Sequence, residues 1–507
     1  MTPVSNSHTL LRCHPQDNVA IALADLPAAA DASDGAVMVR LRDPVGRGHK
    51  VAVAAIAAGE AVVRYGAMIG RACCAIAPGS HVHTHNLATA LTGEVDYRRV
   101  PAGKSDRGGT DPHAPASRMS GTWRGYRRKD GRAATRNEVW ILPTVGCVAP
   151  LAEEAGRLAH ARHAGRIDGV FGFGHPHGCS QLGDDLSGTR ALLAGLADNP
   201  NAGGVLLLGL GCESNQVDAL LAAIPERSRT KVRVLRAQEP GDEMVRTQVL
   251  LDELVDQCAG ATRTEMPPAD LVVGLKCGGS DSWSGLTANP LLGLFSDALA
   301  AAGGKLLLTE IPEIFGAEAD LLDRASSTDV RQQAEAMLNR FKRYFLDQGQ
   351  PVSDNPSPGN IAGGITTLEE KSLGAVQKAG RVPLVDVLGY GAAASKAGLT
   401  LLEAPGNDAV SATALVAAGA TVVLFTTGRG TPLGFPAPTI KVASTSDLAD
   451  RKAHWIDFDA GAMLGPDRSG VCARFSAYVA AVASGEATAS ERAAQRSIAI
   501  WKRGVTL

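Results

Sequence analysis

Three histidines alternate with other residues in one short segment, His81-Val82-His83-Thr84-His85-Asn86. Side chains two residues apart on a strand point to the same face, so the three imidazoles would share one side. Neutral imidazole is a common metal ligand, and a pair with this spacing can bind one divalent ion. We predict a divalent metal site whose ligands are His14, His49, His83 and His85. The alternatives are polar contacts within a β domain or a rim over a neighbouring crevice.

Four cysteines follow predicted apolar strands: Cys147, Cys179, Cys212 and Cys277. Ligands of open parallel sheets bind beyond the carboxyl ends of the strands, so each thiol falls where a ligand would lie. Thiolates suit iron and iron–sulfur clusters, which makes Cys179, Cys212 and Cys277 an alternative set of metal ligands. The sequence lacks a CxxC or other cluster spacing, so an iron–sulfur cluster is the less favoured interpretation. Cysteines can also serve only as small apolar side chains.

Glycine-rich turns with hydroxyl side chains also follow predicted strands, at 277–281 and 426–431. Backbone N–H groups exposed by glycine, together with hydroxyls, bind carboxylates and sugar hydroxyls. We predict substrate contacts from Ser280, Asp281, Thr427 and Arg429. Neither turn matches a Walker A loop or a dinucleotide fingerprint, so nucleotide binding is not supported.

The elements that position these residues change character along the chain. Residues 9–98 contain short β-like stretches punctuated by glycine and proline, which predicts a small, mostly β domain. Residues 99–121 are rich in Gly, Pro, Ser and charge, which predicts a flexible linker. Apolar strands then alternate with amphipathic helices, the pattern of parallel sheets covered on both faces. Because this part is long, we expect two α/β lobes, residues 122–265 and 266–507.

The composition excludes several classes of protein. The 507 residues include 50 Lys and Arg against 52 Asp and Glu, a formal net charge of −2. This balance disfavours nucleic acid and membrane surfaces as partners. No secretory leader or bilayer-spanning apolar run is recognisable, and nine cysteines in a long chain favour reduced thiols. We expect a soluble, cytoplasmic enzyme for a polar small molecule, and the sequence leaves a homo-oligomer open.

Longer segments resemble a known family. The segments 14–20, 64–66 and 81–86 are similar to the N-terminal SAF domain of altronate/galactarate dehydratases. The segments 209–213 and 426–431 are similar to the large catalytic domain of that family, and the resemblance extends over nearly the whole chain outside the predicted linker. It implies a small SAF domain followed by a large α/β dehydratase domain. The histidine segment looks like the altronate branch of the family.

The resemblance implies a hydro-lyase that removes water from a sugar acid. A proton leaves C2, hydroxide leaves C3, and the resulting enol becomes a 2-keto-3-deoxy acid. A metal that chelates the carboxylate and the C2 hydroxyl would stabilise the enediolate. The family is associated with Fe²⁺ or a similar ion such as Mn²⁺. The favoured substrate is D-altronate, which would give 2-dehydro-3-deoxy-D-gluconate. The alternatives are galactarate or another aldonate, aldarate or sulfonated hydroxy acid, and, in a different class, a non-catalytic sugar-acid binding protein.

The resemblance also suggests residue roles. His175 aligns with a turn histidine of the family and is the first candidate for acid or base, with Glu213 and Glu310 as carboxylates at strand ends. Arg429 is the candidate partner of the substrate carboxylate, because a guanidinium forms two parallel hydrogen bonds with that group. The structural alternatives are a histidine that caps a helix and a glutamate that caps a turn.

Overall fold

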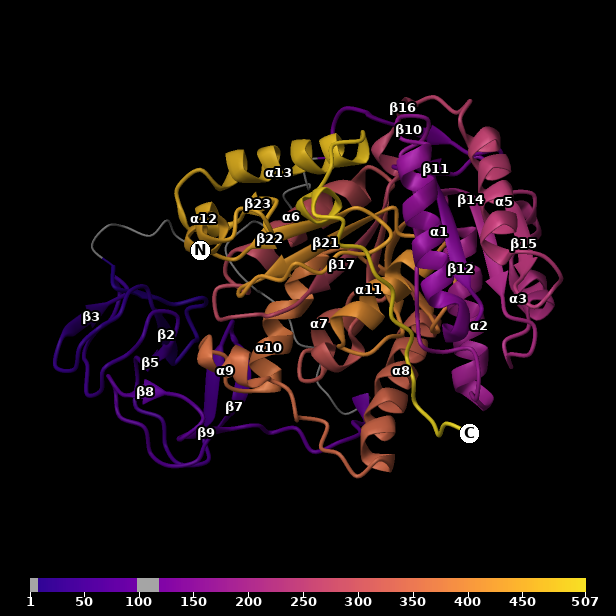
Figure 1. The fold of residues 1–507 in the computed structure, drawn as a ribbon. Helices are drawn as coiled ribbons and strands as arrows, with labels where there is room; N and C mark the ends of the chain where they lie inside the picture. The colour runs from indigo at the N-terminus through magenta and orange to yellow at the C-terminus, as the bar shows by residue number, and fades with distance from the viewer. Residues whose placement is uncertain (1–7, 98–117) are drawn as a thin grey trace.

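The computed structural model describes residues 8–97 and 118–507 and contains a small β domain followed by two α/β lobes (Figure 1). The expected fold class, a small mostly-β domain and a large α/β domain with parallel sheets, is confirmed. Most of the predicted linker lies outside the described residues. Its last residues pack on the second lobe, where the Met119 N–H donates to the Ala298 carbonyl at 3.0 Å.

The small domain consists of short antiparallel strands. They form three sheets, ordered β1-β2-β5-β8, β3-β4 and β6-β7-β9. The bounds of its strands are β1 (Leu10–Leu11), β2 (Val19–Ala22), β3 (Asp31–Ser33), β4 (Met38–Arg40), β5 (Lys50–Ala52), β6 (Ala61–Arg64), β7 (Ala67–Ala72), β8 (His81–Val82) and β9 (Leu87–Ala88). Its residues Tyr65 and Ile69 belong to the same apolar core as Leu368 of the second lobe, so the two parts pack together.

The first lobe is a parallel sheet of order β13-β12-β14-β15. Its strands are β12 (Glu138–Pro143), β13 (Gly169–Gly172), β14 (Ala202–Gly209) and β15 (Val232–Arg236). Alternate residues of β12 enter different cores: Val139 packs with α1 (Ala149–Arg162) and α5 (Glu243–Cys258), and Trp140 packs with α2 (Gly183–Asp198) and α3 (Val217–Ala223). Helices therefore cover both faces, as the apolar strands predicted.

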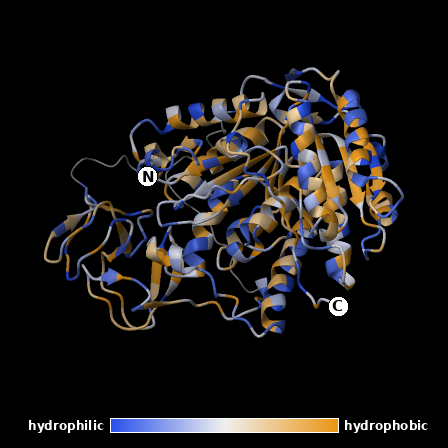
Figure 2. Ribbon diagram, viewed as in Figure 1, coloured by the Kyte–Doolittle hydropathy of each residue, from blue (hydrophilic) through white to orange (hydrophobic). Residues whose placement is uncertain are grey.

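The second lobe is built on a seven-stranded parallel sheet, β19-β20-β18-β17-β21-β22-β23. Its strands are β17 (Val272–Cys277), β18 (Lys305–Leu308), β19 (Leu384–Leu388), β20 (Gly398–Leu402), β21 (Val422–Thr427), β22 (Thr439–Ala443) and β23 (Phe458–Asp459). One face packs on α6 (Ala288–Ala301) and α13 (Arg468–Ala483), and the other packs on α11 (Asp408–Ala417). Figure 2 shows hydrophobic residues concentrated in the strands of both lobes.

The two lobes share an apolar core in which α2 packs against α11. Gly195 permits this approach, because a Cβ there would lie 2.5 Å from the Ala417 carbonyl oxygen. The C-terminal segment returns to the first lobe, where Ile498 and Ile500 enter the shared core. A three-stranded sheet of order β11-β10-β16 pairs the segment that precedes the first lobe with the segment that follows it. Its strands are β10 (Trp123–Arg127), β11 (Ala133–Ala134) and β16 (Thr264–Met266). None of the helices in the described ranges is long and apolar enough to cross a membrane.

Candidate active site between the small domain and the second lobe

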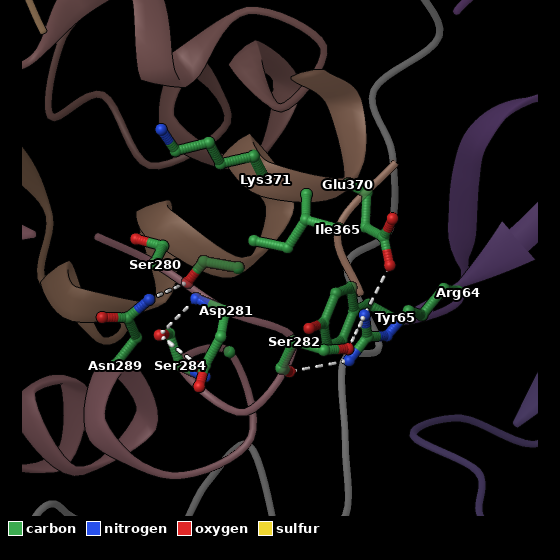
Figure 3. Close-up of a pocket in the computed structure, with 12 residues that line it drawn as sticks. Arg64, Tyr65, Ser280, Asp281, Ser282, Ser284, Asn289, Ile365, Glu370 and Lys371 are labelled. Atoms are coloured by element: carbon green, nitrogen blue, oxygen red, sulfur yellow. Dashed lines mark hydrogen bonds and ion pairs between the residues drawn. The ribbon is translucent and has the colours of Figure 1, made fainter. Parts of the chain in front are cut away.

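A pocket lies where the small domain meets the second lobe (Figure 3). The small domain supplies Arg64 and Tyr65 from the end of β6. The turn after β17 supplies residues 280–285, and the second lobe adds Glu370 and Lys371 from α10 (Leu368–Ala375). The remaining lining residues are Asn289, Ile365 and Gly374. The carboxyl end of a central parallel strand thus faces the pocket, as expected for ligand sites of such sheets.

One buried carboxylate fastens the small domain to this pocket. Lys50 Nζ lies 2.9 Å from Glu370 Oε2, and Arg64 pairs with Glu370 Oε1. Arg64 also donates to the Ser282 carbonyl oxygen at 3.1 Å. Burial acts to raise the pKa of Glu370, but the charges of Lys50 and Arg64 outweigh it and lower the pKa to about 2. The triad of two cations and one carboxylate carries a net positive charge beside the pocket.

A second buried charged cluster lies under the turn after β17. It contains Cys277, three lysines and two glutamates, with Asp408 at its edge. Its ion pairs are Lys276 with Glu310, Lys276 with Asp408 at 2.8 Å, Lys378 with Glu310 at 3.0 Å and Lys371 with Glu313 at 2.9 Å. Burial raises the pKa of the Cys277 thiol to about 12, so the thiol is protonated at neutral pH. It donates to Glu313 Oε2 at 3.2 Å and accepts from Lys378 at 2.8 Å.

The ligand atoms of Cys277, Glu310 and Glu313 lie within 4.8 Å of one another, and within the described ranges no other three do so. This donor set nevertheless does not fit a metal cation. The three ammonium groups already balance the three carboxylates of the cluster. A dication would add uncompensated positive charge in a buried space, which is costly. The cluster instead holds Lys371, one of the residues that line the pocket, through the ion pair with Glu313.

The histidines of the small domain gather beside the same interface. The strand predicted over residues 81–86 is wrong: β8 ends at Val82, and a turn follows in which the Asn86 N–H donates to the His83 carbonyl at 3.0 Å. The turn still groups the rings, with centroids 5.3 Å apart for His81 and His83 and 5.7 Å apart for His81 and His85. His49 joins them, and its Nδ1 lies 3.1 Å from His81 Nε2.

In this histidine cluster, residues 49, 81, 83 and 85, one pair of nitrogen atoms has the separation that a shared divalent ion requires. Two imidazole nitrogens bound at right angles to one ion at about 2.1 Å lie about 3 Å apart, close to the separation of the His49 and His81 nitrogens. Burial, and then the neighbouring imidazoles, lower the pKa of His81 to about 4, which favours the neutral form that binds metals. His83 Nε2 lies 3.2 Å from the Ile361 carbonyl oxygen of α9 (Pro358–Ala362), which places the cluster against the second lobe.

His14 does not belong to this cluster. Its backbone N–H donates to the Asp17 carboxylate at 2.9 Å, and its ring packs against Gly66. Among the described residues no ring contact or hydrogen bond links His14 to the other three predicted ligands. His81, which the predicted set did not include, lies with the other three histidines instead.

The predicted acid–base residues are divided between the lobes. His175 is buried in the first lobe; its Nε2 contacts the Pro143 carbonyl oxygen at 2.8 Å, and its Nδ1 accepts from the His177 N–H at 3.2 Å. Burial lowers the pKa of His175 to about 4. Glu213 accepts hydrogen bonds from Thr144, Leu210 and Gly211 in the same lobe. Both residues therefore order loops there, and the structure does not bring them to Glu310.

The predicted substrate residues are also divided. Ser280 and Asp281 line the pocket, and burial raises the pKa of Asp281, whose carboxylate accepts hydrogen bonds from Ser284 and Ser444. Thr427 ends β21 and accepts from the Gly430 N–H at 2.9 Å, whereas Arg429 is exposed. Neither residue lines the pocket.

Sequence reasoning missed the cations that the pocket does contain, Arg64 and Lys371. Arg64 lies in a segment that carried the family resemblance, but its role depends on Glu370, 306 positions away. Lys371 follows Glu370 on a helix without a motif of its own. No local pattern reveals such a pairing.

Comparison with known proteins gives a consistent result for all three parts of the chain. Residues 8–90 match the altronate/galactarate dehydratase SAF domain, residues 125–259 the second domain of D-galactarate dehydratase/altronate hydrolase, and residues 268–506 the C-terminal domain of D-galactarate/altronate dehydratase. The chain belongs to the D-galactarate/altronate dehydratase family. The resemblance drawn from the sequence is thus confirmed.

Curated members of the dehydratase family match the chain over almost its whole length. Altronate dehydratase of Bacillus subtilis (strain 168) is 45% identical over 504 residues, which cover 98% of this chain and 100% of the relative. Altronate dehydratase of Escherichia coli (strain K12) is 45% identical over 500 residues, 98% and 99% of the two chains. Galactarate dehydratase (L-threo-forming) of Escherichia coli (strain K12) is 32% identical over 469 residues, 89% and 88% of the two chains.

The Glu370 triad predicts a pH-dependent loss of stability. The pKa of Glu370 is about 2 in the folded protein against an ordinary 4.5, so its stabilisation is complete above pH 4.5 and disappears as pH falls towards 2. Glu370→Gln should lower the free energy of unfolding by about 3 kcal/mol at pH 7. In urea unfolding, the difference from wild type should shrink between pH 4.5 and pH 3.

Glu154→Gln is the matched control, because Glu154 pairs with Arg157 on the exposed face of α1. This variant should unfold almost like wild type at both pH values. A stability difference for Glu370→Gln that stays constant across this pH range would contradict the role assigned to the carboxylate.

Proposed function

We propose that this protein is a hydro-lyase that converts D-altronate to 2-dehydro-3-deoxy-D-gluconate and water. The observation that carries the proposal is the boundary between the small domain and the second lobe. Hydroxyl side chains and two cations line a pocket there, and the histidine cluster contacts the second lobe through His83. The identity to altronate dehydratases over 98% of the chain supports the same reaction.

The pocket suits a hydroxy acid with one carboxylate. Its two lining cations are both ion-paired, Arg64 with Glu370 and Lys371 with Glu313. A galactarate enzyme must hold a second carboxylate at C6, and the lining residues of this pocket include no further cation for it. The hydroxyls of Ser280, Ser282 and Ser284 provide partners for substrate hydroxyls.

The histidine cluster is the proposed holder of the divalent ion, with Fe²⁺ favoured and Mn²⁺ as the alternative. When bound, the ion would supply Lewis-acid stabilisation of the charge that develops on the substrate carboxylate. His49 and His81 provide the closest pair of nitrogens, and His83 and His85 complete the cluster. Lys50, next to His49, is held by Glu370, so the triad also fixes the cluster against the pocket.

Lys371 is the proposed proton donor to the C3 hydroxyl that leaves. Burial would lower its pKa, but the charges around it, first that of Glu313, raise the pKa above the ordinary value. The amino group is therefore a charged donor, and the residue that carries it lines the pocket. Glu313 orients it together with Asn355 and Asn360, whose Oδ1 atoms lie 3.0 and 3.2 Å from Lys371 Nζ. Glu310 is proposed as a positioning residue, because it holds two other lysines of the cluster.

A lysine substitution tests this assignment. Lys371→Met should lower kcat by roughly a hundredfold or more, because removal of one preorganised donor typically has an effect of this size. Lys396→Met is the matched control: Lys396 pairs with Asp386 at 2.8 Å and its side chain is 55% exposed. Equal losses of kcat in the two variants, or none in Lys371→Met, would remove Lys371 from the reaction.

Two histidine variants separate the metal site in the structure from the set expected from sequence. His81→Ala should weaken Fe²⁺ or Mn²⁺ binding by at least about tenfold, because it removes one nitrogen of the closest pair. His14→Ala should leave metal affinity unchanged, since His14 lies apart from the cluster. Titration calorimetry with each metal under anaerobic conditions measures both. A larger loss of metal affinity in His14→Ala than in His81→Ala would favour the ligand set predicted from the sequence, which includes His14.

The substrate is tested by kcat/KM for D-altronate and galactarate on one iron-loaded preparation. We expect the value for altronate to be the higher by at least tenfold, because the lining residues offer no additional cation for the C6 carboxylate of galactarate, which would stay unpaired. A higher value for galactarate would overturn the substrate while leaving the dehydratase assignment intact. A cytoplasmic location and a homo-oligomer stay predictions.

A further inference from the structure

A group of thiols lies outside the proposed active site. The loops after β12, β13 and β14 carry Cys147, Cys179 and Cys212, and all three residues are exposed. These strands are parallel neighbours in the order β13-β12-β14, so the three loops leave the same edge of the first-lobe sheet. The first lobe lies across the second lobe from the small domain (Figure 1).

Backbone contacts around Thr144 hold these loops together. The Thr144 carbonyl oxygen accepts from Asn215 Nδ2 at 3.2 Å, and its hydroxyl donates to Glu213. The Asn215 N–H in turn donates to the Gly178 carbonyl at 2.9 Å. Gly178 has a φ of 100°, and a Cβ there would lie 1.9 Å from the Thr144 carbonyl oxygen, so glycine is required.

Each cysteine is adjacent to one of these fixed points. Cys179 follows Gly178, and Cys212 precedes Glu213. Cys147 follows Gly146, whose N–H donates to the His177 carbonyl at 2.8 Å. The three thiols are therefore presented from one preformed surface. Cys277, the fourth strand-end cysteine, is buried in the other lobe and does not belong to this group.

The three thiols do not form a ready site for a single ion. Three thiolates that share one ion at about 2.3 Å lie about 4 Å apart. The three sulfur atoms here are not within 4.8 Å of one another, whereas the ligand atoms around Cys277 are. In an iron–sulfur cubane each thiolate binds a different iron atom, so a wider triangle is required.

We propose that Cys147, Cys179 and Cys212 bind an iron–sulfur cluster on the exposed edge of the first lobe. Each thiol loses its proton on binding iron, and the thiolate triangle then carries negative charge. Arg190 lies beside it, with its Nε 3.3 Å from Asn215 Oδ1. The positive charge of Lys502 also lies near this edge, where it helps to lower the pKa of His177. The next cysteine of this lobe, Cys258, is buried in α5, so this edge of the sheet offers three cysteine ligands. In a [4Fe–4S] cluster bound here, the fourth iron atom would have no cysteine ligand.

The test is anaerobic reconstitution of the full-length protein with ferrous iron and sulfide, followed by desalting. We expect iron and acid-labile sulfide in equal amounts, with the broad visible absorption of a cluster. The triple variant Cys147→Ser, Cys179→Ser, Cys212→Ser should retain less than about a tenth of both. Cys73→Ser, Cys74→Ser is the matched control, because these two cysteines are exposed on the small domain, and it should reconstitute like wild type. Circular dichroism checks that each variant is folded.

Three results would overturn the proposal: iron bound without sulfide, no binding by wild type, or a cluster that persists in the folded triple variant. Zinc bound in place of iron and sulfide would indicate a mononuclear thiolate site instead. Because none of these measurements uses dehydratase activity, their outcome is independent of the proposed function.

Discussion

The arrangement of the active site depends on one buried carboxylate. Glu370 lies on a helix of the second lobe and pairs with Lys50 and Arg64 of the small domain. Removing three ions from water is costly, and the attraction offsets this cost only where the geometry is close and the remaining hydrogen bonds are made. Here the second carboxylate oxygen also accepts from the Thr366 N–H at 2.8 Å. Without this carboxylate two buried cations would face each other, and the packing of the small domain on the second lobe would be weakened.

The same contact determines what the small domain contributes. Arg64 brings Tyr65 into the wall of the pocket, and Lys50 brings the adjacent His49 to the other imidazoles. The second lobe provides the turn after β17 and Lys371. The charges are matched on this side, with three lysines against three carboxylates, whereas the triad keeps one positive charge in excess. The excess positive charge at the boundary between the two domains favours an anionic sugar acid there, beside the proposed metal site and the proposed proton donor.

The sequence predicted the fold better than the site. Unbroken apolar strands such as 205–208 and 272–275, each followed by a helix, are a local signal of a covered parallel sheet, and both sheets are present. The alternation in the histidine segment correctly suggested grouped imidazoles, although a turn and not a strand groups them. His175 and Glu213 satisfied the strand-end rule, yet their polar atoms are taken up by backbone groups. Whether a polar side chain at a strand end binds a ligand or orders a loop depends on neighbours that are distant in sequence, so the sequence pattern alone does not decide it.

The strand-end rule applies to both lobes, but with different chemistry. In the second lobe a buried thiol is kept protonated by its surroundings and surrounded by ammonium groups, so that edge provides proton donors and positive charge. In the first lobe the thiols are exposed, no ammonium group is in hydrogen-bond contact with them in the described structure, and the loops that carry them are fixed by backbone hydrogen bonds. Cysteine at equivalent positions of two parallel sheets thus acquires opposite properties from burial and from the charges beside it. The environment of each edge, and not the residue type, therefore determines which chemistry is open to a strand-end cysteine.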